Sequence, residues 1–128
     1  MAKHINPPSV AAPVGRYTHV VEVPAGARLV YIAGQVGARQ DGTVAEGFEA
    51  QCDQAWRNLK AALEAAGMGF ADVVKLNYYL IDEKDIPALR AVRDRYLVDP
   101  APAATLCVIK ALAAPAFRFE IEAVAAKA

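Results

Sequence analysis

Residues 51–67 read QCDQAWRNLKAALEAAG, and this stretch decides the fold. Its apolar side chains recur at helical spacing and form one stripe, made up of Cys52, Ala55, Trp56, Leu59, Ala62, Leu63 and Ala66. Such a stripe predicts an amphipathic helix that packs one side against a core. Gly67 stands where the helix should end, because glycine readily adopts the left-handed conformation that closes many helices.

The following stretch, residues 73–81, changes from helical spacing to simple alternation. One face carries Val74, Leu76, Tyr78 and Leu80, and the other carries Val73, Lys75, Asn77, Tyr79 and Ile81. Alternation predicts a strand, because successive side chains of a strand point to opposite faces of the sheet. A second helix should follow, with Asp85 as its N-cap and Pro87 in its first turn. The face that this helix buries should hold Ile86, Leu89, Val92 and Tyr96.

Further strands are expected on both sides of this unit. Residues 17–23 and 29–33 flank a turn signal at 24–26, and we expect them to form a hairpin. Residues 5–15 hold three prolines and predict an irregular lead-in. Downstream, prolines separate strands predicted at 105–110 and 117–125. The order ββ-α-β-α-ββ indicates an α+β fold, with two helices on one face of a five-stranded sheet.

The other face of that sheet would remain partly apolar, since Val73, Tyr79 and Ile81 point toward it. Monomeric proteins rarely expose large apolar patches. We therefore expect a homo-oligomer whose subunits pack their sheet faces together.

Length and composition limit the possible classes of protein. A chain of 128 residues fits one domain, residues 1–128, and a hydrophobic content of 55% supplies a core. The formal net charge of +0 argues against partners such as nucleic acid or a membrane surface. No apolar run approaches the length of a membrane-spanning helix. With Cys52 and Cys107 both in patterned segments, a cytoplasmic protein with reduced thiols is the simplest interpretation.

Most catalytic and metal-binding arrangements lack the residues they need. Ser9 is the only serine, and the two histidines, His4 and His19, have no metal-ligand spacing, so neither a serine triad nor a metal site is expected. Cys52 lies on the helical stripe and should be a core residue. Cys107 lies on a predicted strand, where a small buried hydrophobe is favoured over a pocket-lining thiol.

Two charged groups leave alternatives open. Glu120 and Glu122 share one face of the last strand, where they either pair with Arg118 and solvent or orient a water molecule in a pocket. Arg90, Arg93 and Arg95 either form a charged helix surface or bind an anion.

Several segments in order resemble the Rid (reactive intermediate deaminase, or YjgF) family. They are residues 12–17 (APVGRY), 32–37 (IAGQVG), 51–67, 72–75 (DVVK), 102–105 (PAAT) and 120–123 (EIEA). The resemblance covers nearly the whole chain. It implies a chorismate-mutase-like (YjgF-like) fold with a five- or six-stranded mixed sheet, and a homotrimer with a central barrel and small-molecule ligands in clefts between subunits. Active members hydrolyse enamines and imines such as 2-iminopropanoate without a cofactor, and some carry the older name endoribonuclease L-PSP.

The resemblance also assigns roles to individual residues. Tyr17 matches a pocket tyrosine, Ala33 and Gly34 match ligand-facing residues at a strand end, and Glu120 matches the glutamate that holds the attacking water. Cys107 lies near a pocket cysteine, within one residue of register. The substrate-binding arginine of the family, which follows Pro-Ala directly, is replaced here by Ala104.

Ala104 divides the possible functions, because its methyl group cannot make the two charge-assisted hydrogen bonds of a guanidinium. Arg90 or Arg93, near the cleft entrance, would have to compensate. One hypothesis is a C=N hydrolase with a non-standard substrate and weak or no 2-iminopropanoate activity. The alternative is a non-catalytic, ligand-binding or regulatory trimer. A ribonuclease is disfavoured by the neutral charge and the absence of a basic patch.

Overall fold

The computed structural model describes all 128 residues, and its central element is the predicted first helix. Helix α1 spans Phe48–Ala65 and begins three residues earlier than the apolar stripe alone suggests. Gly67 has a positive φ of 72°. Its N–H donates to the Glu64 carbonyl oxygen at 2.9 Å, and the Met68 N–H donates to the Leu63 carbonyl oxygen at 2.9 Å. This paired pattern closes the last turn of the helix, as the glycine predicts.

The main sheet has four strands in the order β3-β6-β4-β5. Their bounds are β3 Arg28–Val36, β4 Val73–Leu80, β5 Ala103–Val108 and β6 Phe119–Lys127. β6 pairs antiparallel with both β3 and β4, whereas β4 and β5 are parallel. Parallel neighbours need a crossover connection, and here it contains helix α2, Ile86–Arg93. The sheet is therefore mixed, as expected.

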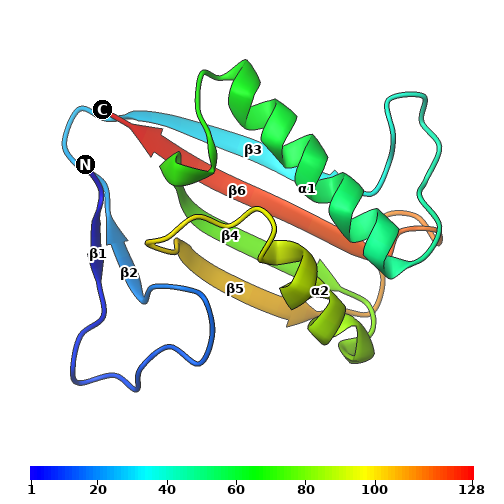
Figure 1. Cartoon of the computed structure of the whole chain (residues 1–128), viewed down its shortest axis with the longest axis horizontal. Helices are drawn as coiled ribbons and strands as arrows, with labels where there is room; N and C mark the ends of the chain where they lie inside the picture. Colours follow the sequence, from blue (N-terminus) through cyan, green and yellow to red (C-terminus); the bar gives the residue numbers. More distant parts are fainter.

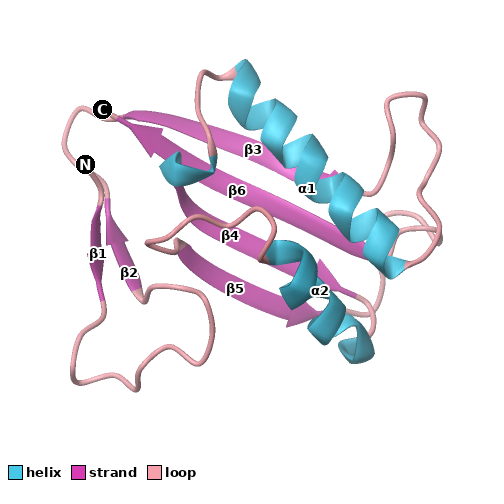
Figure 2. Ribbon diagram, viewed as in Figure 1, coloured by secondary structure: helices cyan, strands magenta, loops and turns pink.

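The predicted hairpin between residues 17–23 and 29–33 is wrong. β2, Val20–Glu22, pairs antiparallel with β1, Lys3–Ile5, and forms a separate two-stranded sheet. The main sheet accordingly has four strands, not five or six (Figures 1 and 2). Alternation specifies that a segment is extended but not which strand it pairs with, and the lead-in folds back to supply the partner. Asn6 fixes this return, because its side-chain oxygen accepts a hydrogen bond from the His19 N–H at 2.9 Å.

Both helices cover the same face of the main sheet, as predicted (Figure 1). Five residues of the helical stripe, Cys52, Ala55, Trp56, Leu59 and Leu63, are at 0% exposure, whereas Ala62 and Ala66 at its margin are partly buried. From the sheet, alternate residues of β4 and β6 meet this stripe, namely Val74, Leu76, Tyr78, Leu80, Phe119, Ile121, Ala123 and Ala125. The predicted faces of these two strands are thus confirmed, except that Val73 is also buried beside a register shift.

The start of α2 differs from the prediction in one respect. Asp85 occupies the N-cap position, but its side chain makes no capping hydrogen bond. Its Oδ2 instead accepts a hydrogen bond from the Arg118 guanidinium at 3.0 Å, which links α2 to the start of β6. Tyr96 lies beyond the end of α2 and stacks on Trp56, with ring centroids 5.6 Å apart.

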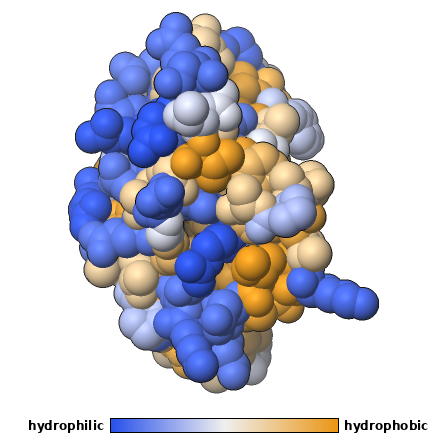
Figure 3. Space-filling model, turned by 90° about the vertical axis from the view of Figure 1, so that its right-hand side faces the viewer, coloured by the Kyte–Doolittle hydropathy of each residue, from blue (hydrophilic) through white to orange (hydrophobic).

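The second face of the main sheet has no helix over it. Leu29 and Tyr31 of β3 are 49% and 76% exposed there. We call this surface, formed by the outward residues of β3, β6, β4 and β5, the open face. In a view turned by 90°, apolar residues gather toward one edge of the molecule and hydrophilic residues toward the other (Figure 3). Neither helix is long and apolar enough to cross a membrane.

Candidate functional site

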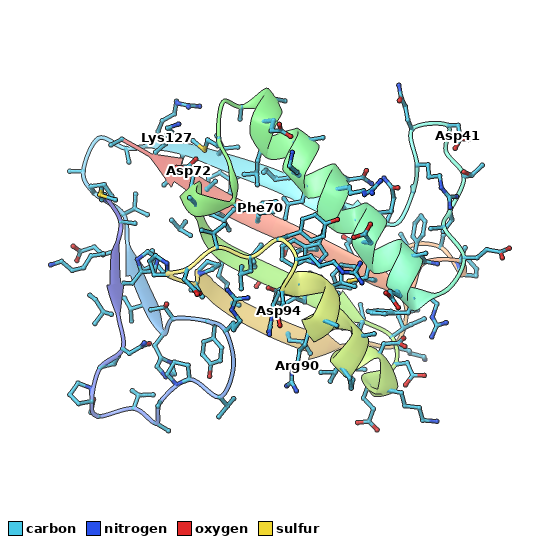
Figure 4. The ribbon with its side chains drawn as sticks, in the orientation of Figure 1. Asp41, Phe70, Asp72, Arg90, Asp94 and Lys127 are labelled. Carbon is cyan, nitrogen blue, oxygen red and sulfur yellow. The ribbon has the colours of Figure 1, made fainter.

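A cavity of about 320 Å³ lies at the edge of the sheet where β5, α2 and the N-terminal loop meet. Its lining residues are Val14, Gly15, Arg16, Tyr17, Tyr78, Ile86, Arg90, Arg93, Ala104 and Leu106. Four of the residues predicted from the sequence are brought together here: Tyr17, Arg90, Arg93 and Ala104. We call this space the edge cavity. Figure 4 shows Arg90 and Asp94 on the α2 side of it.

Arg16 holds the N-terminal loop against the rest of the cavity. Its guanidinium donates to Asp94 and Asp99 carboxylate oxygens at 3.0 Å each. The hydrogen bond from Arg16 lowers the pKa of Asp94 below its usual value, and the bonds to Asp99 and Asp94 raise the pKa of Arg16. Because Tyr17 follows Arg16 directly, this pair of ionic contacts also fixes the tyrosine at the cavity wall.

The remaining arginines of the cavity differ in their contacts. Arg93 is 14% exposed, and its Nε lies 3.2 Å from Asp94 Oδ1. The Arg90 side chain has no hydrogen bond or ion pair within the chain. Arg95 lies away from the cavity and pairs with Glu49 and Asp53, so it belongs to a charged surface. Arg95 thus fits the charged-surface alternative, and the anion-binding alternative stays open for Arg90 and Arg93.

The other predicted site residues lie on the open face. The Glu120 carboxylate lies over Gly34, where a methyl group would overlap its Oε2 atom. The Glu120 side chain has no hydrogen bond or ion pair within the chain. Its neighbour Glu122, in contrast, accepts hydrogen bonds from the Tyr79 hydroxyl at 2.6 Å and the Asn77 amide at 3.2 Å. The bond to Glu122 raises the pKa of Tyr79 to about 12.

These contacts separate the two glutamates that the sequence could not distinguish. Neither pairs with Arg118, whose guanidinium binds Asp85. Glu122 is held by two neighbours in the sheet, whereas Glu120 presents a carboxylate with no partner in the chain. A carboxylate of that kind is the one available to bind and deprotonate water.

Ala33 and Cys107 also lie on the open face. Ala33 borders a shallow hollow with Tyr31, Asn77 and Glu122. In β5, Ala104 and Leu106 line the edge cavity. Cys107 therefore points to the opposite face, since side chains alternate along a strand. It is exposed there, so the expected burial of this cysteine is wrong. Cys52 is buried in the core, which raises the pKa of its thiol to about 12.

The sheet thus divides the predicted residues into two groups. No cavity of the structure is lined by both Ala104 and Glu120. Sequence reasoning missed the other six residues that line the edge cavity, namely Val14, Gly15, Arg16, Tyr78, Ile86 and Leu106. Leu106 could have been found from its alternation with Ala104, but nothing in the sequence distinguishes Tyr78 from the core residues beside it.

Comparison with known proteins gives matches over nearly the whole chain. The sequence model of the endoribonuclease L-PSP family matches residues 8–127. A 2-iminobutanoate/2-iminopropanoate deaminase of Dermatophagoides farinae is 33% identical, with 94% of this chain and 92% of the relative covered. A RutC family protein of Aquifex aeolicus is 34% identical, with 98% and 99% covered.

Solved structures agree with these sequence matches. A Rid family protein of unknown function from Yersinia pestis has a TM-score of 0.81 and 32% identity, over 97% of both chains. RidA from the Antarctic bacterium Psychrobacter sp. PAMC 21119 has a TM-score of 0.73 and 36% identity, with 96% of this chain and 98% of that chain covered. From its sequence and its fold, this chain belongs to the Rid/YjgF/RutC family, the family of the endoribonuclease L-PSP model.

Proposed function

We propose that this protein is a cofactor-free hydrolase of C=N bonds in imines or enamines, in which Glu120 orients the attacking water. The observation that carries the proposal is the free Glu120 carboxylate, which Gly34 accommodates by lacking a side chain. Relatives about 30–34% identical are named 2-iminobutanoate/2-iminopropanoate deaminases, which supports C=N hydrolysis as the reaction class.

The proposed chemistry requires one proton acceptor and one water molecule. Glu120 takes a proton from water as the water oxygen bonds to the imine carbon, and the C=N π electrons move to nitrogen. The proton then passes to that nitrogen. Glu120 carries the hydroxyl proton of the adduct to the same nitrogen as the C–N bond breaks and the carbonyl forms. The leaving group is thereby ammonia, and Glu120 ends as the carboxylate it was at the start.

The candidate site residues lie on opposite faces of the sheet, and this separation supports a proposal about how the chains assemble. Glu120 on the open face and the edge cavity on the helix side cannot act on one small molecule within a single chain. We propose a homotrimer in which clefts between subunits bring the Glu120 side of one chain to the edge cavity of the next. The apolar open face supplies a surface for this assembly.

Ala104 sets the limits on the substrate. The edge cavity has a methyl group where the family resemblance places a guanidinium, so a carboxylate at that point would lack the two hydrogen bonds that the guanidinium of the family supplies. Small imino acids such as 2-iminopropanoate have little besides the carboxylate to bind. Their hydrolysis should therefore be weak at most.

The test measures hydrolysis of 2-iminopropanoate and 2-iminobutanoate, generated by an amino-acid oxidase, with and without the protein. We expect little acceleration by the natural sequence, a gain with Ala104→Arg, and loss of that gain in the double variant with Glu120→Gln. Full activity of the natural protein toward both imines would overturn the argument from Ala104. Activity that survives Glu120→Gln would overturn the role of Glu120.

Ala104 also favours one alternative, a trimer that binds a small molecule without catalysis. That alternative gains if no imine is hydrolysed by either the natural protein or Ala104→Arg while both remain trimeric. A ribonuclease is not proposed, because the formal net charge of +0 offers no excess of basic groups for a nucleic-acid backbone.

A further inference from the structure

The edge cavity contains polar groups that the proposed chemistry does not use. We propose that Arg90, Arg93 and the Tyr78 hydroxyl bind the carboxylate of the ligand, and that the ligand is a carboxylic acid with a branched or otherwise bulky apolar body. The identification of that ligand as an imino acid, or the oxo acid formed from it, rests on the proposed function. The carboxylate site itself rests on the following contacts.

The first observation is the free hydrogen-bonding capacity of the two arginines. They stand three residues apart on α2, so both guanidinium groups lie on one face of the helix. Arg90 has no partner in the chain. Arg93 makes one contact, from Nε to Asp94, which leaves its two terminal nitrogens without a protein partner. A guanidinium with free terminal nitrogens can bind a carboxylate through two parallel hydrogen bonds.

The second observation is a buried hydroxyl without a partner. Tyr78 lines the edge cavity and is 4% exposed. Its hydroxyl oxygen is buried and makes no hydrogen bond within the chain. Burial raises the pKa of Tyr78, so the hydroxyl remains protonated and able to donate. An unpaired buried hydroxyl destabilises the fold, and a ligand oxygen would remove that cost.

The balance of charge around the edge cavity favours an anion. Three arginines line it, Arg16, Arg90 and Arg93, whereas the two carboxylates that pair with them, Asp94 and Asp99, do not. Arg16 uses both of those carboxylates. Arg93 shares Asp94 with Arg16, so three guanidinium groups are matched by two carboxylates. The single positive charge in excess corresponds to Arg90, which has no ion pair and lies on the wall that α2 contributes.

The apolar residues that line the edge cavity indicate the chemistry of the rest of the ligand, beyond its carboxylate. Val14, Ile86, Ala104 and Leu106 line the edge cavity with apolar side chains. A guanidinium at position 104 would occupy part of this space, and the methyl group leaves it open. A volume of about 320 Å³ is also larger than a three-carbon acid needs. An acid with a branched aliphatic group would fill the space and bury apolar surface against these residues.

The experiment measures binding, which does not depend on catalysis. 4-Methyl-2-oxopentanoate is the probe, with pyruvate and the methyl ester of the probe as comparison ligands, and affinity is measured by titration calorimetry. We expect the probe to bind at least tenfold more tightly than either comparison ligand, since one lacks the apolar body and the other lacks the charge. Binding by the ester as tight as by the acid would overturn the carboxylate site.

Substitutions test Arg90, Arg93 and the Tyr78 hydroxyl one at a time. Arg90→Gln and Arg93→Gln should each weaken probe binding about tenfold or more, and Tyr78→Phe by a smaller factor. Arg57→Gln, at an exposed arginine on α1, is the matched control and should bind as the natural protein does. The Arg90 side chain has no hydrogen bond or ion pair to lose, so Arg90→Gln should keep the unfolding temperature of the natural protein, which is measured alongside binding. Unchanged affinity in Arg90→Gln and Arg93→Gln together would sink the inference.

The binding and hydrolysis experiments distinguish a failure of the carboxylate site from a failure of the proposed hydrolase function. If the probe binds through Arg90 and Arg93 but no imine is hydrolysed, the carboxylate site stands and the hydrolase proposal falls. If imines are hydrolysed with dependence on Glu120 but the probe binds equally well without the two arginines, the hydrolase stands and the carboxylate site is wrong.

Discussion

At the scale of single residues, Gly34 shows why the IAGQVG segment contains glycine at that point. Its φ is not in the left-handed region, so the reason is space rather than backbone conformation. The Glu120 carboxylate occupies the volume that a side chain at residue 34 would need. The glycine of β3 and the glutamate of β6 therefore form one local unit, although 86 residues separate them in the chain.

We expect Gly34→Ala to change the position of Glu120 with little effect on stability, because the atoms displaced are at the end of a flexible side chain. Thermal unfolding should stay within about 3 °C of the natural protein. In an Ala104→Arg background that hydrolyses 2-iminopropanoate, the added methyl group should lower kcat about tenfold or more.

Gly69→Ala is the matched control, since open space surrounds Gly69 and its φ of −141° suits alanine. It should leave both the unfolding temperature and kcat unchanged. If Gly34→Ala retains full kcat, then the position of Glu120 over Gly34 is not needed for hydrolysis.

Four of the residues that line the edge cavity could be named from the sequence, but their separation by the sheet from Glu120 and Cys107 could not. Ala104 and Cys107 are three apart in one strand, and that odd spacing places them on opposite faces of the sheet. Likewise, the sequence could not show that Glu122 is hydrogen-bonded by Tyr79 while Glu120 is free, because that difference depends on which strands are neighbours.

At the scale of elements, Gln51 explains how α1 is attached to the rest of the fold. It is 3% exposed, yet both ends of its amide are hydrogen-bonded. The Nε2 atom donates to the Ala116 carbonyl oxygen at 2.9 Å, and the Oε1 atom accepts from the Arg118 N–H at 2.9 Å. The backbone of Gln51 also packs directly against Gly37, where a side chain would overlap it.

We expect Gln51→Leu to lower the free energy of unfolding by about 1–3 kcal/mol, because the two part-buried hydrogen bonds to the Ala116 carbonyl and the Arg118 N–H would be lost. Urea unfolding followed by the fluorescence of Trp56 measures the change. Gln54→Leu, on the same helix but hydrogen-bonded only to Asn58, should cost much less. Equal decreases in the free energy of unfolding for Gln51→Leu and Gln54→Leu would show that the two hydrogen bonds of the Gln51 amide do not stabilise the attachment of α1.

The N-terminal loop gives a prediction about pH. The pKa of Asp94 is lowered in the folded protein by the hydrogen bond from Arg16, so this contact stabilises the loop above the ordinary aspartate pKa of 3.8. The stabilisation should be lost as the pH falls below 3.8 and through the lower folded-state pKa of Asp94. Hydrogen exchange of residues 10–18 should then accelerate more than exchange in α1.

Asp94→Asn provides the check on that mechanism. The variant should show faster exchange of the loop already at pH 7, and its exchange should depend less on pH in the acidic range. A loop that remains as protected in Asp94→Asn as in the natural protein would show that the contact does not hold it.

The elements show where a sequence pattern is sufficient and where it is not. α1 follows from its stripe and from Gly67, because both signals are local. The pairing of β2 with β1 could not be predicted, since the alternation of residues 17–23 fits any partner strand. The four-stranded sheet follows from that choice, because the edge of β3 is left without the hairpin partner that the turn at 24–26 suggested.

At the scale of the whole molecule, the open face and the divided site lead to the same expectation. Leu29 and Tyr31 expose apolar surface on the face that also carries Glu120. A subunit packed against that face would cover the apolar surface and could also place a second chain's edge cavity near Glu120. The same assembly would thus bury the exposed apolar surface and complete the site.

We therefore expect light scattering to give about three times the chain mass of 13.6 kDa. Leu29→Lys should shift the protein toward monomer, because a charge would have to be desolvated at the interface. Val98→Lys is the matched control, since Val98 has a similar exposure of 43% but follows α2 on the other side of the sheet, and it should stay trimeric. If Leu29→Lys becomes monomeric and also loses imine hydrolysis in the Ala104→Arg background, while it still binds 4-methyl-2-oxopentanoate, then catalysis needs two chains and carboxylate binding needs one. A monomeric natural protein with full activity would refute this assignment, because Glu120 and the edge cavity would then have to act from opposite faces of the same sheet.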